Sequence, residues 1–308
     1  MSRIGDRGEM EAFVRSVELG SFSDAARELK LSPSALSKLV TRLEGMLKVR
    51  LVHRTTRCIH ATPEGELFMA RCRRILAEME DAEMEVGRSR DAPRGRLRMH
   101  MGVGFGTHQM IKEMPRFLDR YPDVRLDLVV EDRRVDMTRE NIDISVQPWA
   151  SDTTAFVVRR LFYFERITCA SPAYLKRYGA PHTPEDLARH RCMGVSSVPN
   201  NMRWQFQMPK GPRMIDIAPD IGVNNADCVY RFALSGLGIV RLSEYIVAEA
   251  LRDGRLVKVL SEFHRPEQLT MLAIYPHERH RLPRVAAMLA FLAATFADRP
   301  WRKCRMQT

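Results

Sequence analysis

The chain has 308 residues, 45% of them hydrophobic, and a formal net charge of +11. This length allows about two domains with their own cores, and the ordinary apolar fraction excludes a fibrous or disordered chain. The positive charge favours a polyanionic partner, so the position of the basic residues along the chain has to be considered.

Neither cysteine spacing nor apolar runs indicate a metal centre, an export signal or a membrane span. The six cysteines show no C-x-x-C pair and no histidine at metal-ligand spacing, which predicts reduced thiols and leaves a redox pair of Cys169 with Cys192 open. The N-terminal MSRIGDRGEMEAF contains no apolar signal core, and no apolar run has the length of a membrane span. We therefore expect a cytoplasmic protein with no membrane partner.

Three short helices are predicted near the N-terminus. Apolar residues at i, i+3, i+4 and i+7 from Met10 to Val17 predict an amphipathic helix that ends at Gly20. Ser23 is expected to cap a second helix through DAARELK. Ser32 followed by Pro33 starts a third, because proline is tolerated at the first helical position. Two short helices joined by a tight turn are typical of a helix-turn-helix.

The third helix has one apolar and one polar face. Its apolar residues between Leu36 and Leu43 keep the i, i+3, i+4, i+7 spacing and should face the first two helices. The outward face then carries Ser34, Ser37, Lys38, Thr41 and Arg42. Such side chains suit the base edges and phosphates of a DNA major groove.

Basic residues concentrate in and after this helix. Between Arg27 and Arg57 there are eight basic residues against two acidic ones, a net charge of +6, which phosphate binding requires. Arg50-Leu51-Val52 predicts a short strand, and HRTTR a turn. We interpret the segment as a wing whose Arg54, Thr55 and Arg57 lie against the DNA backbone or minor groove. Periodicity alone would fit a solvated helical triple equally well.

Longer segments resemble one protein family. GSFSDAARELKLSPSALSKLVTRLEGMLKVRLVHRTTR and then TPEGELF resemble the winged helix-turn-helix of the LysR-type transcriptional regulators. PRGRLRM, FLDRYPDVRLDLVV, CASPAYLKRYGAPHTPEDLARHRC, ALSGLGI and LPRVAAMLAFLAATFA resemble the effector domain of that family. The resemblance covers nearly the whole chain, in the expected order and spacing.

The resemblance implies an α+β multidomain protein. Its parts would be a winged helix-turn-helix DNA-binding domain in residues 1–62, a linker helix and hinge in 63–93, and an α/β effector domain in 94–308. That domain would consist of two subdomains around a cleft, like a periplasmic binding protein. Subdomain I would comprise about 94–164 and 269–308, and subdomain II about 165–268.

A long helix is predicted from Thr62, as its cap, and Pro63, as its first residue, to Val86. Its apolar seam consists of Met69, Cys72, Leu76, Met79 and Val86. So wide an apolar flank predicts a partner helix from a second subunit. The resemblance likewise implies that this helix forms a dimer.

Strand-like and helical runs alternate in the remaining chain. The predicted strands are 97–103, 124–131, 142–146 and 166–170, and the predicted helices are 107–121, 172–178 and 226–235. This alternation predicts an α/β fold with mostly parallel strands.

Three glycines precede the first of these helices. Gly102, Gly104 and Gly106 do not match the dinucleotide motif G-x-G-x-x-G, because its third glycine would fall at Thr107. We interpret them as clearance for a ligand at a helix N-terminus, where backbone N–H groups favour an anion.

Ligands of open α/β sheets lie beyond the carboxyl ends of the strands. With the family's pocket placed on those ends, the predicted effector contacts are Gly104, Thr107, Arg133, Trp149, Ser196 and Asn224. Thr107, Ser196 and Asn224 are the preferred hydrogen-bonding groups. Arg133 is either a carboxylate partner or a solvated loop residue, and Trp149 either packs in the core or forms a wall of the cleft.

No catalytic motif accompanies this pattern. G-x-S-x-G, H-E-x-x-H and a P-loop are missing, and no partner is spaced to work with His100 or His108. We therefore expect neither enzymatic activity nor a cofactor.

The predicted function is a sequence-specific LysR-type regulator that forms a dimer or tetramer. Its partners would be an interrupted palindrome in double-stranded DNA, RNA polymerase, and a small-molecule effector in the cleft, with anions among the candidates. The predicted DNA contacts are Ser23, Pro33, Ser34, Ser37, Lys38, Thr41, Arg42, Arg54, Thr55 and Arg57. Two alternatives stay open: a solute-binding sensor that shares the second half, and a nucleotide-dependent enzyme that uses the glycine segment.

Overall fold

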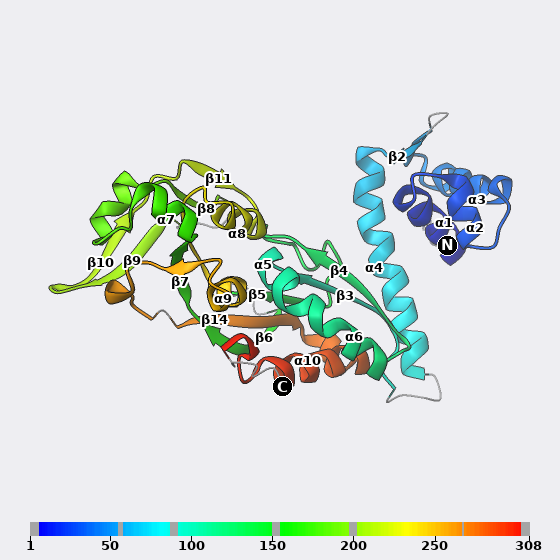
Figure 1. The fold of residues 1–308 in the computed structure, drawn as a ribbon. Helices are drawn as coiled ribbons and strands as arrows, with labels where there is room; N and C mark the ends of the chain where they lie inside the picture. Colours follow the sequence, from blue (N-terminus) through cyan, green and yellow to red (C-terminus); the bar gives the residue numbers. More distant parts are fainter. Residues whose placement is uncertain are drawn as a thin grey trace. The chain divides into compact units, whose positions relative to one another are not determined.

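The computed structural model describes residues 6–54, 58–86, 92–149, 155–196, 202–266 and 268–302 (Figure 1). The chain divides into two compact units: Met1–Asp91 with Asp136–Asn141, and Ala92–Val135 with Ile142–Thr308. Within the described ranges, no helix is long and apolar enough to cross a membrane.

The N-terminal unit is a winged helix-turn-helix followed by a long helix. Its elements are α1 (Arg7–Glu18), α2 (Phe22–Glu28), α3 (Pro33–Leu47), the hairpin of β1 (Val52–Arg54) with β2 (Ile59–Ala61), and α4 (Pro63–Val86). Phe13 of α1 and Leu36, Val40 and Leu43 of α3 are fully or almost fully buried in one core. The predicted inner face of the third helix is therefore confirmed.

Serine side chains cap the two helices of the motif. Ser32 Oγ accepts a hydrogen bond from Ala35 N (3.2 Å) and Pro33 is the first helical residue, as predicted. The cap predicted at Ser23 is wrong: Ser21 Oγ accepts from Asp24 N (3.3 Å). The helix begins at Phe22 because that side chain already packs against the core.

The wing strand begins two residues later than predicted. Glu44, buried near the end of α3, accepts hydrogen bonds through Oε1 from Leu51 N (2.8 Å) and Val52 N (3.2 Å). The carbonyl oxygen of Arg50 accepts a bond from Thr62 Oγ1 (2.8 Å). Side chains thus bond the backbone groups of Arg50 and Leu51. Pairing with β2 therefore starts at Val52, opposite Ala61.

Helix α4 starts as predicted, because Thr62 Oγ1 accepts a hydrogen bond from Gly65 N (2.9 Å). The residues of its apolar seam differ in how far they are buried. Met69 and Cys72 are buried in the core of the N-terminal unit, so assigning them to a partner helix is wrong. Leu76 is partly buried against the same core, Met79 remains 40% exposed, and the side chain of Val86 lies outside the description.

The second unit contains two five-stranded sheets, each the centre of a subdomain. The first sheet has the order β4-β3-β5-β14-β6 and the second the order β11-β8-β12-β7-β13. The strands are β3 (Gly95–Met101), β4 (Val124–Val130), β5 (Ile144–Gln147), β6 (Phe156–Phe164), β7 (Arg166–Ala170), β8 (Cys192–Val195), β11 (Ile221–Val223), β12 (Ile239–Ser243), β13 (Val257–Lys258) and β14 (Leu269–Pro276), with a separate hairpin of β9 (Arg203–Met208) and β10 (Gly211–Asp216).

Helices cover both sheets. They are α5 (Val103–Phe105), a π-helical turn (Gly106–Met110), α6 (Ile111–Arg120), α7 (Pro172–Tyr178), α8 (Ala226–Leu234), α9 (Glu244–Arg252), α10 (Pro283–Phe296) and short 3-10 turns at Pro184–Arg189, Ser261–Phe263, His277–Arg281 and Pro300–Arg302. Helix α10 packs on the first subdomain, where Phe296 contacts Phe105 with ring centroids 5.0 Å apart.

The predicted predominance of parallel strands is wrong. β3 is parallel to β4 and β5, and β8 is parallel to β11 and β12, but β14 and β7 are antiparallel to both of their neighbours. β6 ends at Phe164 and β7 begins at Arg166, whereas β14 returns to the first sheet beside β6 (Figure 1). Strands that carry the chain between sheets need no crossover helix, which permits antiparallel pairing.

The start of α4 provides a test of packing in the N-terminal unit. A Cβ added at Gly65 would lie 2.0 Å from the carbonyl oxygen of Leu51, so Gly65→Ala has to displace the wing backbone. We expect a loss of about 1–3 kcal/mol in the stability of this unit. Urea titration of the full chain, followed by hydrogen–deuterium exchange of peptides from residues 6–86, measures it.

Gly45 in α3 is the matched control, since a Cβ there meets nothing within 4 Å. Gly45→Ala should stabilise the same peptides by up to about 1 kcal/mol, because alanine is the better helix former. Equal protection in the two variants would contradict the close contact at Gly65.

Candidate functional site

The outward face of α3 is polar, as predicted. Pro33, Ser34, Lys38, Thr41 and Arg42 are exposed, and Ser37 is half-buried. Thr41 Oγ1 donates a hydrogen bond to the carbonyl oxygen of Ser37 (2.8 Å), so it presents an acceptor lone pair outward. Ser34 Oγ lies 3.1 Å from the Oγ of the capping Ser32. The face therefore offers acceptors, donors and one lysine within about two helical turns.

Arg42 also has a structural contact that the sequence did not reveal. Its Nε lies 2.9 Å from Oε1 of Glu9, whose side chain is 1% exposed. Glu9 also accepts a hydrogen bond from Asp6 N (3.1 Å) through its other oxygen. A buried carboxylate needs such partners, so Arg42 ties α3 to the start of α1. The sequence signal for this contact was an acidic residue, Glu9, within the amphipathic first helix.

The remaining predicted DNA contacts lie on α2 and the wing. Ser23 is exposed in the first turn of α2. Arg54 ends β1, and its side chain is outside the description, as are Thr55 and Arg57. Glu44 Oε2 lies 3.4 Å from Nη1 of Arg50. One of the two acidic residues in the basic segment is therefore paired inside the unit.

In the second unit, strands of both sheets surround a cavity of about 90 Å³. Its lining includes Val146 near the end of β5, Val195 at the end of β8 and Ser243 at the end of β12. These are carboxyl ends of strands, where α/β sheets bind ligands. The other lining residues are Gly102, Gly104, Phe105, Asp132, Pro148, Trp149, Phe164, Arg166, Ala226, Arg241, Leu242, Tyr245, Ile246 and Met271.

Two of the predicted effector contacts, Gly104 and Trp149, line this cavity. The other four are not among its lining residues. Arg133 is exposed and paired with Glu131 (Nη2 to Oε1, 2.8 Å), and Ser196 donates its backbone N–H to Val223 O (2.7 Å). Thr107 belongs to the π-helical turn, and Asn224 is exposed after β11. Strand order was not available from sequence, so neighbouring loop residues could not be ranked.

Gly104 and Gly106 have a packing role that the sequence analysis did not predict. A Cβ at Gly104 would lie 2.4 Å from Cδ1 of Ile246, and one at Gly106 would lie 2.8 Å from Cγ1 of Val130. The glycines therefore permit close packing of α5 against α9 and the first sheet.

Two helices at the cavity have their first backbone N–H groups bonded by a side chain of the protein. Asp132 accepts hydrogen bonds from Val103 N (Oδ1, 2.9 Å) and Ala226 N (Oδ2, 3.0 Å), the first residues of α5 and α8. Nothing in the sequence indicated this bridge between the subdomains. Arg166 and Arg241 were also missed, although an arginine inside the apolar strand IVRLS was a usable signal.

Two further polar contacts link the π-helical turn to α8 and α9. His108 Nε2 lies 3.1 Å from Oδ1 of Asp227, and its ring stacks edge-on against Tyr230 with centroids 4.8 Å apart. Gln109 Nε2 donates to the carbonyl oxygen of Tyr245 (2.7 Å). Burial lowers the pKa of His108 below its ordinary 6.5, against the opposing effect of Asp227. Neutral imidazole is therefore favoured in this contact.

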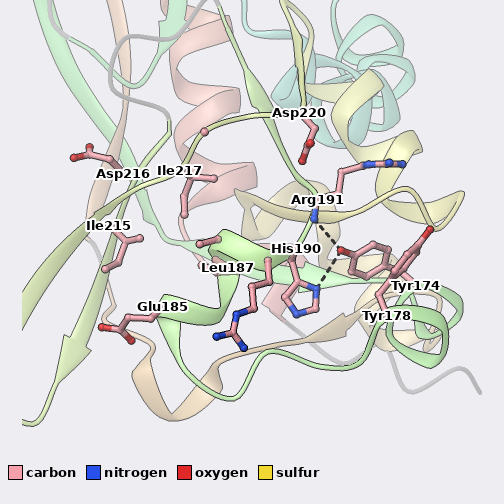
Figure 2. Close-up of a pocket in the computed structure, with 13 residues that line it drawn as sticks. Tyr174, Tyr178, Glu185, Leu187, His190, Arg191, Ile215, Asp216, Ile217 and Asp220 are labelled. Carbon is pink, nitrogen blue, oxygen red and sulfur yellow. Dashed lines mark hydrogen bonds between the residues drawn. The ribbon is translucent and has the colours of Figure 1, made fainter.

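A larger hollow of about 540 Å³ lies in the second subdomain (Figure 2). Its polar groups bond one another: the Tyr174 hydroxyl lies 3.1 Å from His190 Nδ1 and accepts from Arg191 N (3.0 Å). Arg191 directly precedes β8, so this hollow lies at the amino end of that strand. Position and chemistry therefore favour the smaller cavity as the ligand site.

Among the described residues, no three His, Cys, Asp or Glu side chains are grouped so as to hold a metal ion. Cys72, Cys169 and Cys192 are buried, and burial raises the pKa of each thiol to about 12. Thiols with such values are poor nucleophiles, which gives no support to a redox pair of Cys169 with Cys192.

A winged helix-turn-helix joined to a two-subdomain α/β binding domain defines a ligand-responsive transcriptional regulator, and sequence comparison agrees. Residues 8–66 match the model of the bacterial regulatory helix-turn-helix protein, lysR family, and residues 90–297 match the LysR substrate binding domain. The chain belongs to the LysR family of transcriptional regulators, as the sequence motifs predicted.

Relatives match over nearly their full length. The HTH-type transcriptional regulator CrgA of Neisseria meningitidis serogroup C (strain 8013) is 32% identical over 92% of this chain and 95% of its own. DmlR of Escherichia coli (strain K12) is 30% identical over 97% of both chains. The structure of CrgA matches with a TM-score of 0.63 over 93% of this chain and 97% of that one, at 32% identity.

The buried histidine predicts a pH dependence. Unfolding releases His108 to its ordinary pKa of about 6.5, so below that pH the unfolded chain binds more protons than the folded one. Stability should fall as pH decreases through about 6.5 and level off below the folded pKa. His190, whose pKa burial also lowers, acts in the same direction.

Urea unfolding of the second unit between about pH 8 and pH 5 measures this dependence. His108→Gln should reduce the dependence to the part contributed by His190, whereas His182→Gln, at an exposed position, is the control and should leave it intact. An unchanged dependence in His108→Gln would show that the imidazole is not held neutral.

Proposed function

We propose that this LysR-type regulator reads an interrupted palindrome in double-stranded DNA through the outward face of α3. The observation that supports this most directly is the row of exposed polar side chains on α3, within a segment of net charge +6. Major-groove bases present donors and acceptors to such side chains, and the flanking cations neutralise phosphates.

Within this proposal the side chains have separate roles. Ser34, Ser37, Lys38 and Arg42 read or anchor the major groove, with Pro33 and Thr41 beside them. Ser23, Arg54, Thr55 and Arg57 hold phosphates. Since Arg42 already pairs with Glu9, its contribution is to fix the angle of α3 as well as to contact DNA. Phosphate contacts position the protein, whereas base contacts supply specificity.

The proposed assembly is a dimer or a tetramer built from dimers, in which α4 pairs with its counterpart. Met79, a seam residue that remains exposed, supports a partner on α4. Paired N-terminal domains then place two recognition helices on successive half-sites. As a regulator that acts on the chromosome, the protein functions in the cytoplasm and there alters access of RNA polymerase.

The effector domain completes the proposal. A small molecule binds in the cavity between the subdomains, where Gly104 and Trp149 contribute to the wall. Its binding changes the relative stability of two arrangements of the domain and so the spacing of the DNA-binding domains. No catalytic step is part of this function.

The direct test is fluorescence anisotropy of the full-length protein with DNA from immediately upstream of its own gene, against random competitor and added salt. Tight binding that survives competitor supports sequence reading. Equal and weak binding to both DNAs would show that α3 binds polyanions without sequence specificity.

Lys38→Ala tests the assignment of α3 in the same assay. Loss of one phosphate or guanine contact should weaken binding and reduce the slope of log affinity against log salt by up to about one unit. Lys176→Ala, at an exposed site on α7, is the matched control and should bind like the parent. If both variants kept parental affinity and slope, α3 would not be the contact surface.

A further inference from the structure

The C-terminal turn Pro300–Arg302 contacts both subdomains. Trp301 is 7% exposed, and its ring centroid lies 5.0 Å from that of Phe162 and 5.7 Å from that of Tyr245. Phe162 belongs to β6 of the first sheet, whereas Tyr245 belongs to α9, which directly follows β12 of the second sheet. The turn is therefore anchored by its aromatic side chain where the two subdomains meet.

The last residue of the turn, Arg302, binds two carboxylates. Its Nε donates to Oε2 of Glu244 (2.6 Å), and its Nη2 donates to Oε1 of Glu244 (2.8 Å) and to Oε1 of Glu165 (2.8 Å). Charge-assisted bonds of this bidentate kind are strong and geometrically specific. Glu244 is the first residue of α9, and Glu165 is the one residue between β6 and β7. One guanidinium thus joins the outgoing connection between the sheets to a helix of the second subdomain.

Further bonds include the connection through which the chain returns. Glu244 N donates to the carbonyl oxygen of Glu165 (2.8 Å), and Glu165 N donates to Oε1 of Glu244 (3.3 Å). His264 Nε2 lies 2.9 Å from Oε2 of Glu165. His264 precedes β14, the strand that returns the chain to the first sheet. Both connections between the sheets therefore meet in one network, which we call the crossover lock: Glu165, Glu244, His264 and Arg302.

The crossover lock adjoins the cavity. Both of its glutamates have cavity-lining residues as direct neighbours in the sequence, although Arg302 itself does not line the cavity. These neighbours are Phe164, Arg166, Ser243 and Tyr245. A backbone shift at either glutamate moves the lining residues beside it, because planar peptide units join consecutive residues. The position of this part of the cavity wall therefore depends on Arg302.

Arg302 holds the two glutamates together. The side chain of Glu244 is 9% exposed, and it shares one guanidinium nitrogen with Glu165. A carboxylate with so little water contact needs a partner of opposite charge, and two carboxylates at one site repel. A neutral residue 302 would therefore let the outgoing connection separate from the start of α9. Hinge motions are absorbed by a few residues at such connections.

We propose that Arg302 is a positioning residue of the cavity: through the crossover lock it fixes the connections between the subdomains and so holds the cavity wall in shape before a ligand binds. A wall fixed in advance loses less freedom on binding, which raises ligand affinity. The inference rests on the proposed function only in taking the cavity as the effector site.

Hydrogen–deuterium exchange of the full-length protein at single-residue resolution, without ligand or DNA, tests the lock in Arg302→Gln. The amides of Glu165 and Glu244 should exchange at least about tenfold faster than in the parent, since their bonds depend on the arrangement that Arg302 maintains. The amides of Val103 and Ala226, at the helix starts on another part of the cavity wall, should keep parental exchange.

Three further variants separate positioning from a general packing defect. Arg302→Lys keeps the charge without the bidentate geometry, so its exchange should lie between those of the parent and Arg302→Gln. Glu244→Gln added to Arg302→Gln removes the buried charge that has lost its partner, so this double variant should exchange more slowly than Arg302→Gln alone, whereas two packing defects would add. Arg203→Gln, which removes an ion pair with Asp216 (3.0 Å) on the β9–β10 hairpin, is the matched control and should exchange like the parent.

Three results would overturn the inference: parental exchange at Glu165 and Glu244 in Arg302→Gln, acceleration of the same size at Val103 and Ala226, or faster exchange in the double variant than in Arg302→Gln. These measurements involve no DNA, so they decide the crossover lock even where anisotropy with the upstream DNA refutes the regulator. Parental exchange together with tight, specific DNA binding would refute the lock and leave the proposed function standing.

Discussion

The carboxylate of Asp132 bonds backbone N–H groups in both subdomains, and the geometry around the cavity depends on this contact. Val103 N and Ala226 N are the first donors of α5 and α8, which have no partner inside their own helices. One side chain at the end of β4 satisfies both, so the two helices start at the same point. A Cβ at Gly104 would accordingly lie 3.5 Å from the Cβ of Ala226, because α5 and α8 start close together.

Buried acids perform a comparable task in the N-terminal unit, in spite of its positive charge. Glu44 accepts the N–H groups of Leu51 and Val52 and thereby attaches the wing to α3. Glu9 bonds Asp6 N and pairs with Arg42. A charge count along the sequence treats these acids as a reduction of the DNA-binding potential. In the folded unit both are 5% exposed or less, and each positions a segment of the basic surface.

Local features were readable from the sequence, and tertiary ones were not. Ser32, Pro33 and the α7 range Pro172–Tyr178 follow from capping and periodicity, which act over a few residues. The division of the α4 seam does not, because the same apolar spacing serves Met69 inside the domain and Met79 outside it. Likewise, the cavity arginines become neighbours only through the pairing of β7 with β12, which one sequence without strand order does not specify.

The same contacts constrain how a ligand could act. Asp132, His108 with Asp227, and Gln109 with the carbonyl oxygen of Tyr245 hold the subdomains together through bonds of the chain itself. A ligand shifts an equilibrium between arrangements only by its difference in affinity for them. With hydrogen bonds that each contribute about 0.5–1.5 kcal/mol, a small molecule has enough binding energy to alter this balance.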